Sequence, residues 1–197
     1  MRLDLRLSTL LREPRVTAEF QKPLNLHGIL KAIHFDAWIE ERKDRLQPPV
    51  CIQQLWRDTD FIVSVVGGPN RRHDYHDDPL EELFYQFKGN AYLSIMTPEG
   101  PRRVDLDEGA IFLMPPHVRH SPQRPETGSL CLLVERTRPQ GLLDAFEWFC
   151  PNCHQLLHRV EAHVTDLATE LPQAFDAFHA DAARRTCKRC GTLHPGK

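Results

Sequence analysis

The chain has 197 residues, of which 41% are hydrophobic and 26% charged, and its formal net charge at pH 7 is -2. This length allows one main domain with a full hydrophobic core and a small appendage. Basic and acidic residues are interspersed, which disfavours a nucleic-acid-binding protein, and no apolar run is long enough for a membrane-spanning helix. We therefore expect a cytoplasmic protein that binds a small molecule, with neither nucleic acid nor a membrane as partner.

Residues 1–30 give mixed signals, and we predict no firm structure for this N-terminal extension. Its leucines are interrupted by Asp4, Arg6, Arg12 and Glu13, so a secretory signal is not expected. The segment is rich in arginine, as transit peptides are, but the two acidic residues argue against that interpretation.

The segment 35–49 has the spacing of a helix. Trp38, Ile39 and Leu46 recur near helical intervals, and the proline pair at 48–49 would end the helix. The chain changes character after this point.

Short apolar runs bounded by Gly, Pro, Asn or Asp follow as far as Glu135, a pattern typical of strands joined by turns. The runs are DFIVSVVGG, ELFYQFKG, NAYLSIMTP, RRVDLDEG, AIFLMPP and SLCLLVER. They predict an all-β barrel or sandwich, which we place at residues 31–146. Phe84, Tyr85 and Phe87 are expected to pack in the barrel and in the wall of a pocket.

Three potential metal ligands, His76, Glu82 and His120, lie in this β-rich part. Alternate residues of an extended segment share a face, so Arg72 and Asp74 would project to the same side as His76. Two imidazoles with one carboxylate are typical of non-haem Fe(II) sites, because three ligands on one side of the ion leave positions for substrate and dioxygen.

The spacing of these ligands resembles the two motifs of the cupin superfamily, which builds a metal site inside a small β-barrel. The motifs read His76-x5-Glu82-x6-Gly89 and Gly109-x5-Pro115-x4-His120. The resemblance implies a cupin β-barrel, or jelly-roll. Asp74 stands where the commoner motif has its first histidine, and His117 stands where cupins usually have glycine. His73 would point away from His76 and is not expected to bind the metal.

A closer resemblance extends from about Phe35 to the C-terminus. The stretches GPNRRHDYHDDPLEELFYQFKGN, EGAIFLMPPHVRHSPQRPE and LLVER are together similar to the 3-hydroxyanthranilate 3,4-dioxygenase family, and the paired C-x-x-C tail resembles its bacterial form. The resemblance implies that His76, Glu82 and His120 bind catalytic Fe2+. It further implies cleavage of the ring of 3-hydroxyanthranilate by O2 to 2-amino-3-carboxymuconate semialdehyde, a precursor of quinolinate and NAD in tryptophan degradation by the kynurenine pathway. We also expect a homodimer.

The same resemblance assigns Arg72, Arg124 and Glu135 to the substrate pocket, with Glu82 at its border and Asp74 nearby. Two guanidiniums beside a metal suit an aromatic carboxylate, because their planar forks match it bidentately. Glu135 is our first candidate for the catalytic acid or base and Asp74 the second. Both are equally plausible as structural partners of the arginines.

The C-terminal part, 147–197, carries two C-x-x-C pairs with a partly helical segment between them. The pairs are Cys150–Cys153 and Cys187–Cys190. Two such pairs are typical of a closed tetrahedral site with no open coordination position, so we predict a structural metal, either zinc or rubredoxin-like iron, in a small helical lobe. A mixed site that includes His154 and a redox dithiol are weaker alternatives.

Two other classes of function compete with a dioxygenase. One is a non-enzymatic cupin that binds a metal or a small acid, and the other is a metal-dependent cupin sugar isomerase. Sugar isomerases typically resemble the fuller histidine pattern that Asp74 interrupts, and a sensor usually carries a DNA-binding module that this sequence lacks. We therefore favour the dioxygenase.

Overall fold

The computed structural model describes residues 32–48, 51–57, 59–163 and 171–196, without the side chains of 171–174. The predicted N-terminal extension lies outside these residues. The chain divides into two compact units, Met1–Phe35 and Asp36–Lys197, and the second contains every strand described here. No helix in the described part is long and apolar enough to cross a bilayer.

The segment predicted as one helix forms two short elements. Helix α2 (Phe35–Glu40) ends after six residues, and the 3-10 turn η1 (Lys43–Leu46) follows it. Trp38 and Leu46 are buried, and the guanidinium of Arg42 lies over the Trp38 ring, 4.6 Å from its centroid. The spacing therefore predicts the buried positions correctly but not the break between the two elements.

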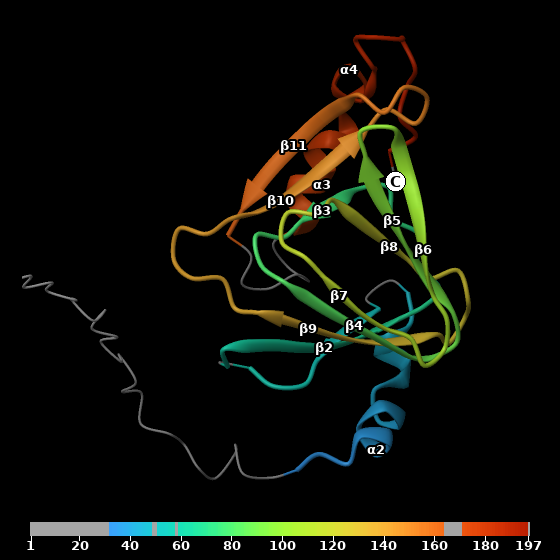
Figure 1. Ribbon diagram of the computed structural model, residues 1–197, viewed down its shortest axis with the longest axis vertical. Helices are drawn as coiled ribbons and strands as arrows, with labels where there is room; N and C mark the ends of the chain where they lie inside the picture. The colour runs from blue at the N-terminus through green and yellow to red at the C-terminus, as the bar shows by residue number, and fades with distance from the viewer. Residues whose placement is uncertain (1–31, 49–50, 58, 164–170, 197) are drawn as a thin grey trace, which may run out of the picture. The chain divides into compact units, whose positions relative to one another are not determined.

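Two antiparallel sheets make up the rest of the fold (Figure 1). The first has the order β1-β2-β9-β4-β7, and the second has the order β11-β10-β3-β8-β5-β6. The first sheet consists of β1 (Ile52–Gln54), β2 (Phe61–Gly67), β4 (Glu82–Lys88), β7 (Ile111–Met114) and β9 (Leu130–Arg136). The second consists of β3 (Tyr75–Asp77), β5 (Ala91–Thr97), β6 (Gly100–Leu106), β8 (His120–Gln123), β10 (Asp144–Phe149) and β11 (Leu156–Ala162). All six predicted apolar runs form strands.

Strand β4 shows which face of the first sheet is the inner one. Glu82, Phe84 and Gln86 are buried, and they alternate with less buried residues because successive side chains of a strand point to opposite faces. Phe84 belongs to the main hydrophobic core, where it packs with Leu93 of the second sheet. Tyr85 lies on the outer face and is 39% exposed, so the prediction that it packs inside the barrel is wrong.

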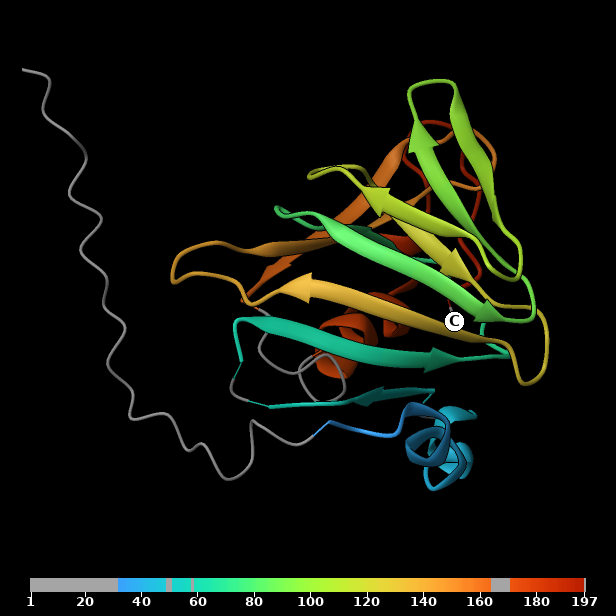
Figure 2. The same ribbon diagram turned by 60° about the horizontal axis from the view of Figure 1, so that its bottom comes forward.

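Strands β10 and β11 extend the second sheet beyond the expected end of the barrel. Strand β10 pairs with β3 on one side and β11 on the other, and its bounds, 144–149, include residue 146. Strands β10 and β11 are drawn in orange in Figure 2. Five of the six residues of β10 are buried, so no polar alternation marks it as a strand in the sequence. The expected helical region follows as α3 (Leu171–Ala180) and α4 (Ala182–Arg185).

Helix α3 packs against β10 and forms a second hydrophobic core. The Phe178 ring stacks on Trp148 at 4.5 Å, and the Phe175 ring meets Phe146 edge-on at 5.3 Å. Helix α3 thus packs on the strand that runs beside His76, since Phe146 and His76 are direct register partners.

Candidate metal sites

Three strands bring the predicted ligands together inside the barrel. His76 of β3 is the register partner of His120 of β8, and Glu82 reaches them from β4 of the other sheet. His76 Nδ1 lies 2.9 Å from Glu82 Oε1, and His120 Nε2 lies 3.1 Å from Glu82 Oε2. All three residues are buried, and one potential ligand atom from each lies within 4.8 Å of the others.

The arrangement of this His76, Glu82 and His120 cluster fits a metal ion. Glu82 Oε1 is buried and accepts no hydrogen bond, although His76 Nδ1 lies 2.9 Å away, and a shared cation would satisfy both atoms. The outward nitrogens have partners of their own: His76 Nε2 lies 2.8 Å from Asp144 Oδ1, and His120 Nδ1 lies 2.8 Å from the carbonyl oxygen of Val118. Metal-binding histidines are typically oriented by such contacts of the second nitrogen.

Electrostatics also favour a cation here. Burial alone would lower the pKa of His76, but the carboxylates of Glu82 and Asp144 outweigh burial and raise that pKa to about 10. Burial alone would raise the pKa of Glu82, yet His120 and His76 hold it well below its ordinary value. The carboxylate of Glu82 thus stays ionised beside His76, whose pKa is raised, and a divalent ion can supply the positive charge at this position instead.

Further buried carboxylates surround the cluster. The guanidinium of Arg138 forms ion pairs with three of them, Asp78, Glu135 and Asp144. Burial and the charge of Glu82 raise the pKa of Asp78 to about 8, and the same two causes raise the pKa of Glu135. The sequence predicts Glu135 but not Asp78, Asp144 or Arg138. The second aspartate in "HDD" after His76 is the one signal that could have pointed to them.

The two predicted arginines differ in their partners. Arg72 is paired with Asp74, Nε to Oδ1 at 3.2 Å, and this pairing outweighs burial and lowers the pKa of Asp74. Arg124 is 3% exposed and its Nε has no hydrogen-bond partner. Its guanidinium interacts with the Cys131 thiol, and no carboxylate of the described residues forms an ion pair with it. Buried arginines are rare unless paired, so an anionic ligand is a fitting partner for Arg124.

Two histidines that were not expected to bind metal lie apart from the cluster. His117 is exposed, and its φ of 61° is the left-handed conformation that glycine adopts most easily, at a position where cupins usually have glycine. The ring of His73 meets the ring of His194 edge-on at 5.9 Å.

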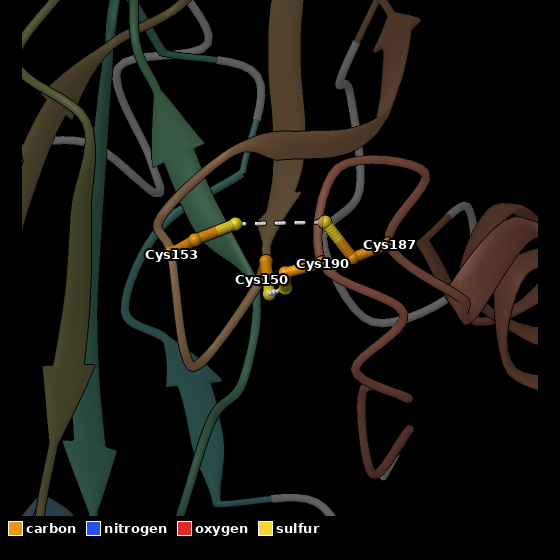
Figure 3. Close-up of side chains that lie close together, drawn as sticks. All are labelled: Cys150, Cys153, Cys187 and Cys190. Carbon is orange, nitrogen blue, oxygen red and sulfur yellow. Dashed lines mark hydrogen bonds between the residues drawn. The ribbon is translucent and has the colours of Figure 1, made fainter.

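The four cysteines of the tail meet in a second cluster, in which the side chains point toward one another (Figure 3). The sulfurs of Cys150 and Cys190 lie 3.5 Å apart, as do those of Cys153 and Cys187. These distances exclude disulfides and approach the roughly 3.7 Å expected around a tetrahedral ion with bonds of about 2.3 Å. The sulfurs therefore lie in positions that suit one metal ion.

The two C-x-x-C pairs have the same backbone turn. The amide of His154 donates to the Cys150 carbonyl at 2.9 Å, and the amide of Gly191 donates to the Cys187 carbonyl at 2.8 Å. Both donor residues have positive φ, 58° and 74°. The His154 ring lies against Gly100, where an added side-chain carbon would come within 2.8 Å of it, and His154 is not part of the sulfur cluster.

Two facing β-sheets with a buried His-Glu-His cluster define a metal-dependent protein of the cupin type. The family model for 3-hydroxyanthranilic acid dioxygenase matches residues 29–179. This chain belongs to that family. The prediction of the family is therefore confirmed, and the two antiparallel sheets agree with the predicted all-β fold.

Close relatives carry the same family name. A 3-hydroxyanthranilate 3,4-dioxygenase of Burkholderia cenocepacia is 57% identical over 167 residues, which cover 85% of this chain and 94% of that protein. A protein of the same name from Paraburkholderia phytofirmans is 56% identical over 167 residues, which cover 85% of this chain and 96% of that protein. A solved cupin-2 domain protein of Shewanella frigidimarina is 15% identical with a TM-score of 0.41 over 53% of this chain and 94% of that one, a likeness too weak to bear on the site.

Proposed function

We propose that this protein is an Fe2+-dependent 3-hydroxyanthranilate 3,4-dioxygenase, which cleaves the aromatic ring of its substrate with both atoms of O2. The observation that carries the proposal is the meeting of His76, Glu82 and His120 inside the barrel. The 57% identity to a relative of that name supports the choice of substrate.

His76, Glu82 and His120 would hold the catalytic ion. When bound, Fe2+ would supply open coordination positions for an aminophenol and dioxygen. The protein contributes orientation and electrostatics, because the cluster lies among buried carboxylates and under aromatic rings that exclude water.

The substrate carboxylate would bind to Arg124. This guanidinium is buried and has no carboxylate partner among the described residues, so an incoming carboxylate would supply the missing charge. Arg72 is the second candidate for this contact, and Asp74 holds it in place. Glu82 would border the ring from the metal side.

Glu135 is the better candidate for moving a proton during the reaction. Its pKa is raised by burial and by the charge of Glu82, whereas the pKa of Asp74 is lowered by Arg72. A carboxyl group with a raised pKa holds a proton more readily than an ordinary one and can release it to a partner. We therefore assign Asp74 to positioning Arg72.

The cysteine cluster would hold a structural zinc or iron ion in the C-terminal lobe, 147–197, beside the catalytic barrel, 31–146. Four sulfurs leave a tetrahedral ion with no open position, which suits structure better than catalysis. Four thiols that form no disulfide suit a reducing compartment, and we place the protein in the cytoplasm.

We also propose a homodimer formed through the outer face of the first sheet. Register places Leu83 and Tyr85 of β4 beside Leu113 and Ile111 of β7, and the two β7 residues are 54% and 68% exposed. Strand β7 pairs only with β4 among the described strands, so this apolar face ends at an open edge. Contiguous exposed apolar side chains typically mark a protein interface.

The activity is tested by loading the protein with Fe2+ without oxygen, then adding 3-hydroxyanthranilate and oxygen. A near-ultraviolet-absorbing product should form, with one O2 consumed per turnover. Absence of product would leave the non-enzymatic cupin and the sugar isomerase as the remaining explanations.

A further inference from the structure

The guanidinium of Arg138, in the chain just after β9, is completely buried. Its Nε donates to both carboxylate oxygens of Asp144 at 3.0 and 2.9 Å, and its Nη1 donates to Glu135 at 2.7 Å. Its Nη2 donates to Asp144 at 2.6 Å and also to Asp78. One side chain thus fixes three carboxylates from different parts of the chain.

Each of two of these carboxylates lies beside a residue of the metal cluster. Asp144 Oδ1 lies 2.8 Å from His76 Nε2, on the side of the ring opposite the Nδ1 that faces Glu82. Glu135 is the register partner of Glu82. Arg138 therefore reaches the cluster by two separate routes, one through His76 and one along the sheet to Glu82.

The ring of His76 is held on two sides. Phe146 stacks on its face at 4.9 Å with an interplanar angle of 4°, and Asp144 lies at its edge. Stacking alone allows the ring to flip by about 180° around its Cβ–Cγ bond, whereas the hydrogen bond to Asp144 fixes which nitrogen faces Glu82. The orientation of the ligand thus depends on the position of the Asp144 carboxylate.

Charge explains why Asp144 needs Arg138. Asp78, Glu82, Glu135 and Asp144 are all buried, and among the described residues Arg138 is the one guanidinium that contacts three of them. Without it, three carboxylates would lose their shared donor in a medium that poorly screens their repulsion, and they would move apart or take up protons.

We propose that Arg138 and Asp144 are positioning residues for the metal centre. Arg138 fixes the carboxylate of Asp144, Asp144 orients the imidazole of His76, and the second arm of Arg138 holds Glu135 in place beside Glu82. This inference rests on the proposed function only for the presence of a metal ion at His76, Glu82 and His120.

The test measures metal affinity without substrate. Arg138→Lys keeps the charge but loses the planar fork, and Asp144→Asn keeps the shape but loses the charge. Co2+ is titrated into each metal-free protein against a chelator, and the thiolate site is followed separately by its sulfur-to-cobalt charge-transfer bands. We expect each variant to weaken the barrel site by about 10–100-fold while the sulfur site is unchanged.

Arg159→Lys is the matched control. Arg159 also contacts three carboxylates, those of Asp77, Glu147 and Glu161. Asp77 follows His76 in the chain, but none of the three carboxylates is part of the metal cluster. Its replacement should change the barrel affinity by less than about twofold. Because Arg138 and Asp144 act through the same ligand, the double variant should lose much less than the product of the two single losses.

Barrel affinity within twofold of the original protein in folded Asp144→Asn would overturn the inference, as would equal losses in Arg159→Lys. If Arg138→Lys fails to fold, the near-isosteric Asp144→Asn decides alone. Failure of the original protein to bind metal in the barrel would instead overturn the proposed function, so the two failures are distinguishable.

Discussion

Glu82 of β4 and Glu135 of β9 are direct register partners, and both carboxylates are buried on the inner face of the first sheet. Like charges opposite each other destabilise a strand pair, and more so away from water. His76 and His120 contact Glu82, while Arg138 binds Glu135 at 2.7 Å. The pairing of these two strands therefore depends on the imidazole and guanidinium groups that contact their carboxylates.

Replacing His120 by alanine should remove the barrel metal and the turnover together. The loss should exceed the roughly 10–100-fold that a contact outside the ligand set costs, because a ligand itself is gone. Metal analysis and oxygen uptake measure both effects. The control is His117→Ala, which removes an exposed imidazole three residues away and should leave both unchanged. Retention of metal by His120→Ala would show that the ligand set is wrong.

Arg124→Ala should chiefly weaken substrate binding. Charge-assisted hydrogen bonds contribute about 1.5–3 kcal/mol, so we expect KM to rise by roughly 10–100-fold with a smaller change in kcat. Stability should change little, because Arg124 has no ion pair with a described residue to lose. Arg102→Ala, which removes an exposed arginine of β6, is the control. An unchanged KM would place the substrate carboxylate elsewhere.

The metal-free protein should become less stable as pH rises from about 6.5 to about 10. His76 has a folded-state pKa of about 10 against an ordinary value of 6.5, so its stabilising contribution is full below pH 6.5 and is lost as pH rises through 10. The pKa of Asp78 is raised from 3.8 to about 8, because its ionisation is disfavoured in the folded state. Asp78 therefore also lowers the stability of the folded protein as pH rises between these two values.

Glu82 and Asp144 have lowered pKa values and act in the opposite direction. Their contribution is present above their ordinary values near pH 4 and is lost as pH falls below them. Urea unfolding at pH 6 and pH 9 measures the difference in the free energy of unfolding between the two pH values, which we expect to be about a few kcal/mol. Saturation with Fe2+ or Co2+ should reduce this pH dependence of stability, because the metal replaces protons on the histidines. Equal stability at the two pH values would contradict this prediction.

Cys150→Ser should empty the sulfur site while the barrel keeps its metal. A loss of about 2 kcal/mol would lower Tm by roughly 4–8 °C in a protein of this size. His154→Ala should keep both metals, because the His154 ring lies against Gly100 and not in the sulfur cluster. Metal content per chain measures each outcome. Loss of the tail metal in His154→Ala would instead favour a mixed site.

Ile111→Glu should convert a dimer to monomers. The side chain is 68% exposed in the single chain, and burial of a carboxylate in an apolar interface is costly. Light scattering after gel filtration measures the mass in solution. Leu156→Glu changes an exposed leucine of β11 in the other sheet and should leave the mass unchanged. A monomeric original protein would refute the proposed dimer outright.

The sequence predicts the fold and the His76, Glu82 and His120 cluster because each rests on short-range patterns. The strand runs are short, apolar and bounded by turn residues, and the ligands occupy fixed places in two motifs. The prediction that His76 pairs with His120 requires only that both motifs are assigned to strands of one sheet.

Arg138 and Asp144 escape prediction because nothing local marks them. Arg138 contacts Asp78, 60 residues earlier, and Asp144 contacts His76, 68 residues earlier. A lone arginine before proline and an aspartate at the start of a strand are common on surfaces. Their burial follows from how β9 and β10 are placed in different sheets, which no local pattern encodes.

Strand β10 begins at Asp144, beside the His76 imidazole, and leads directly into Cys150. A barrel excised at residue 146 would cut this strand in its middle, remove Glu147 from its pairing with Tyr75 of β3 and remove Trp148 from the second hydrophobic core. Protein engineers who want a minimal catalyst from this scaffold must therefore keep the tail or rebuild β10 with a new covering for Phe146.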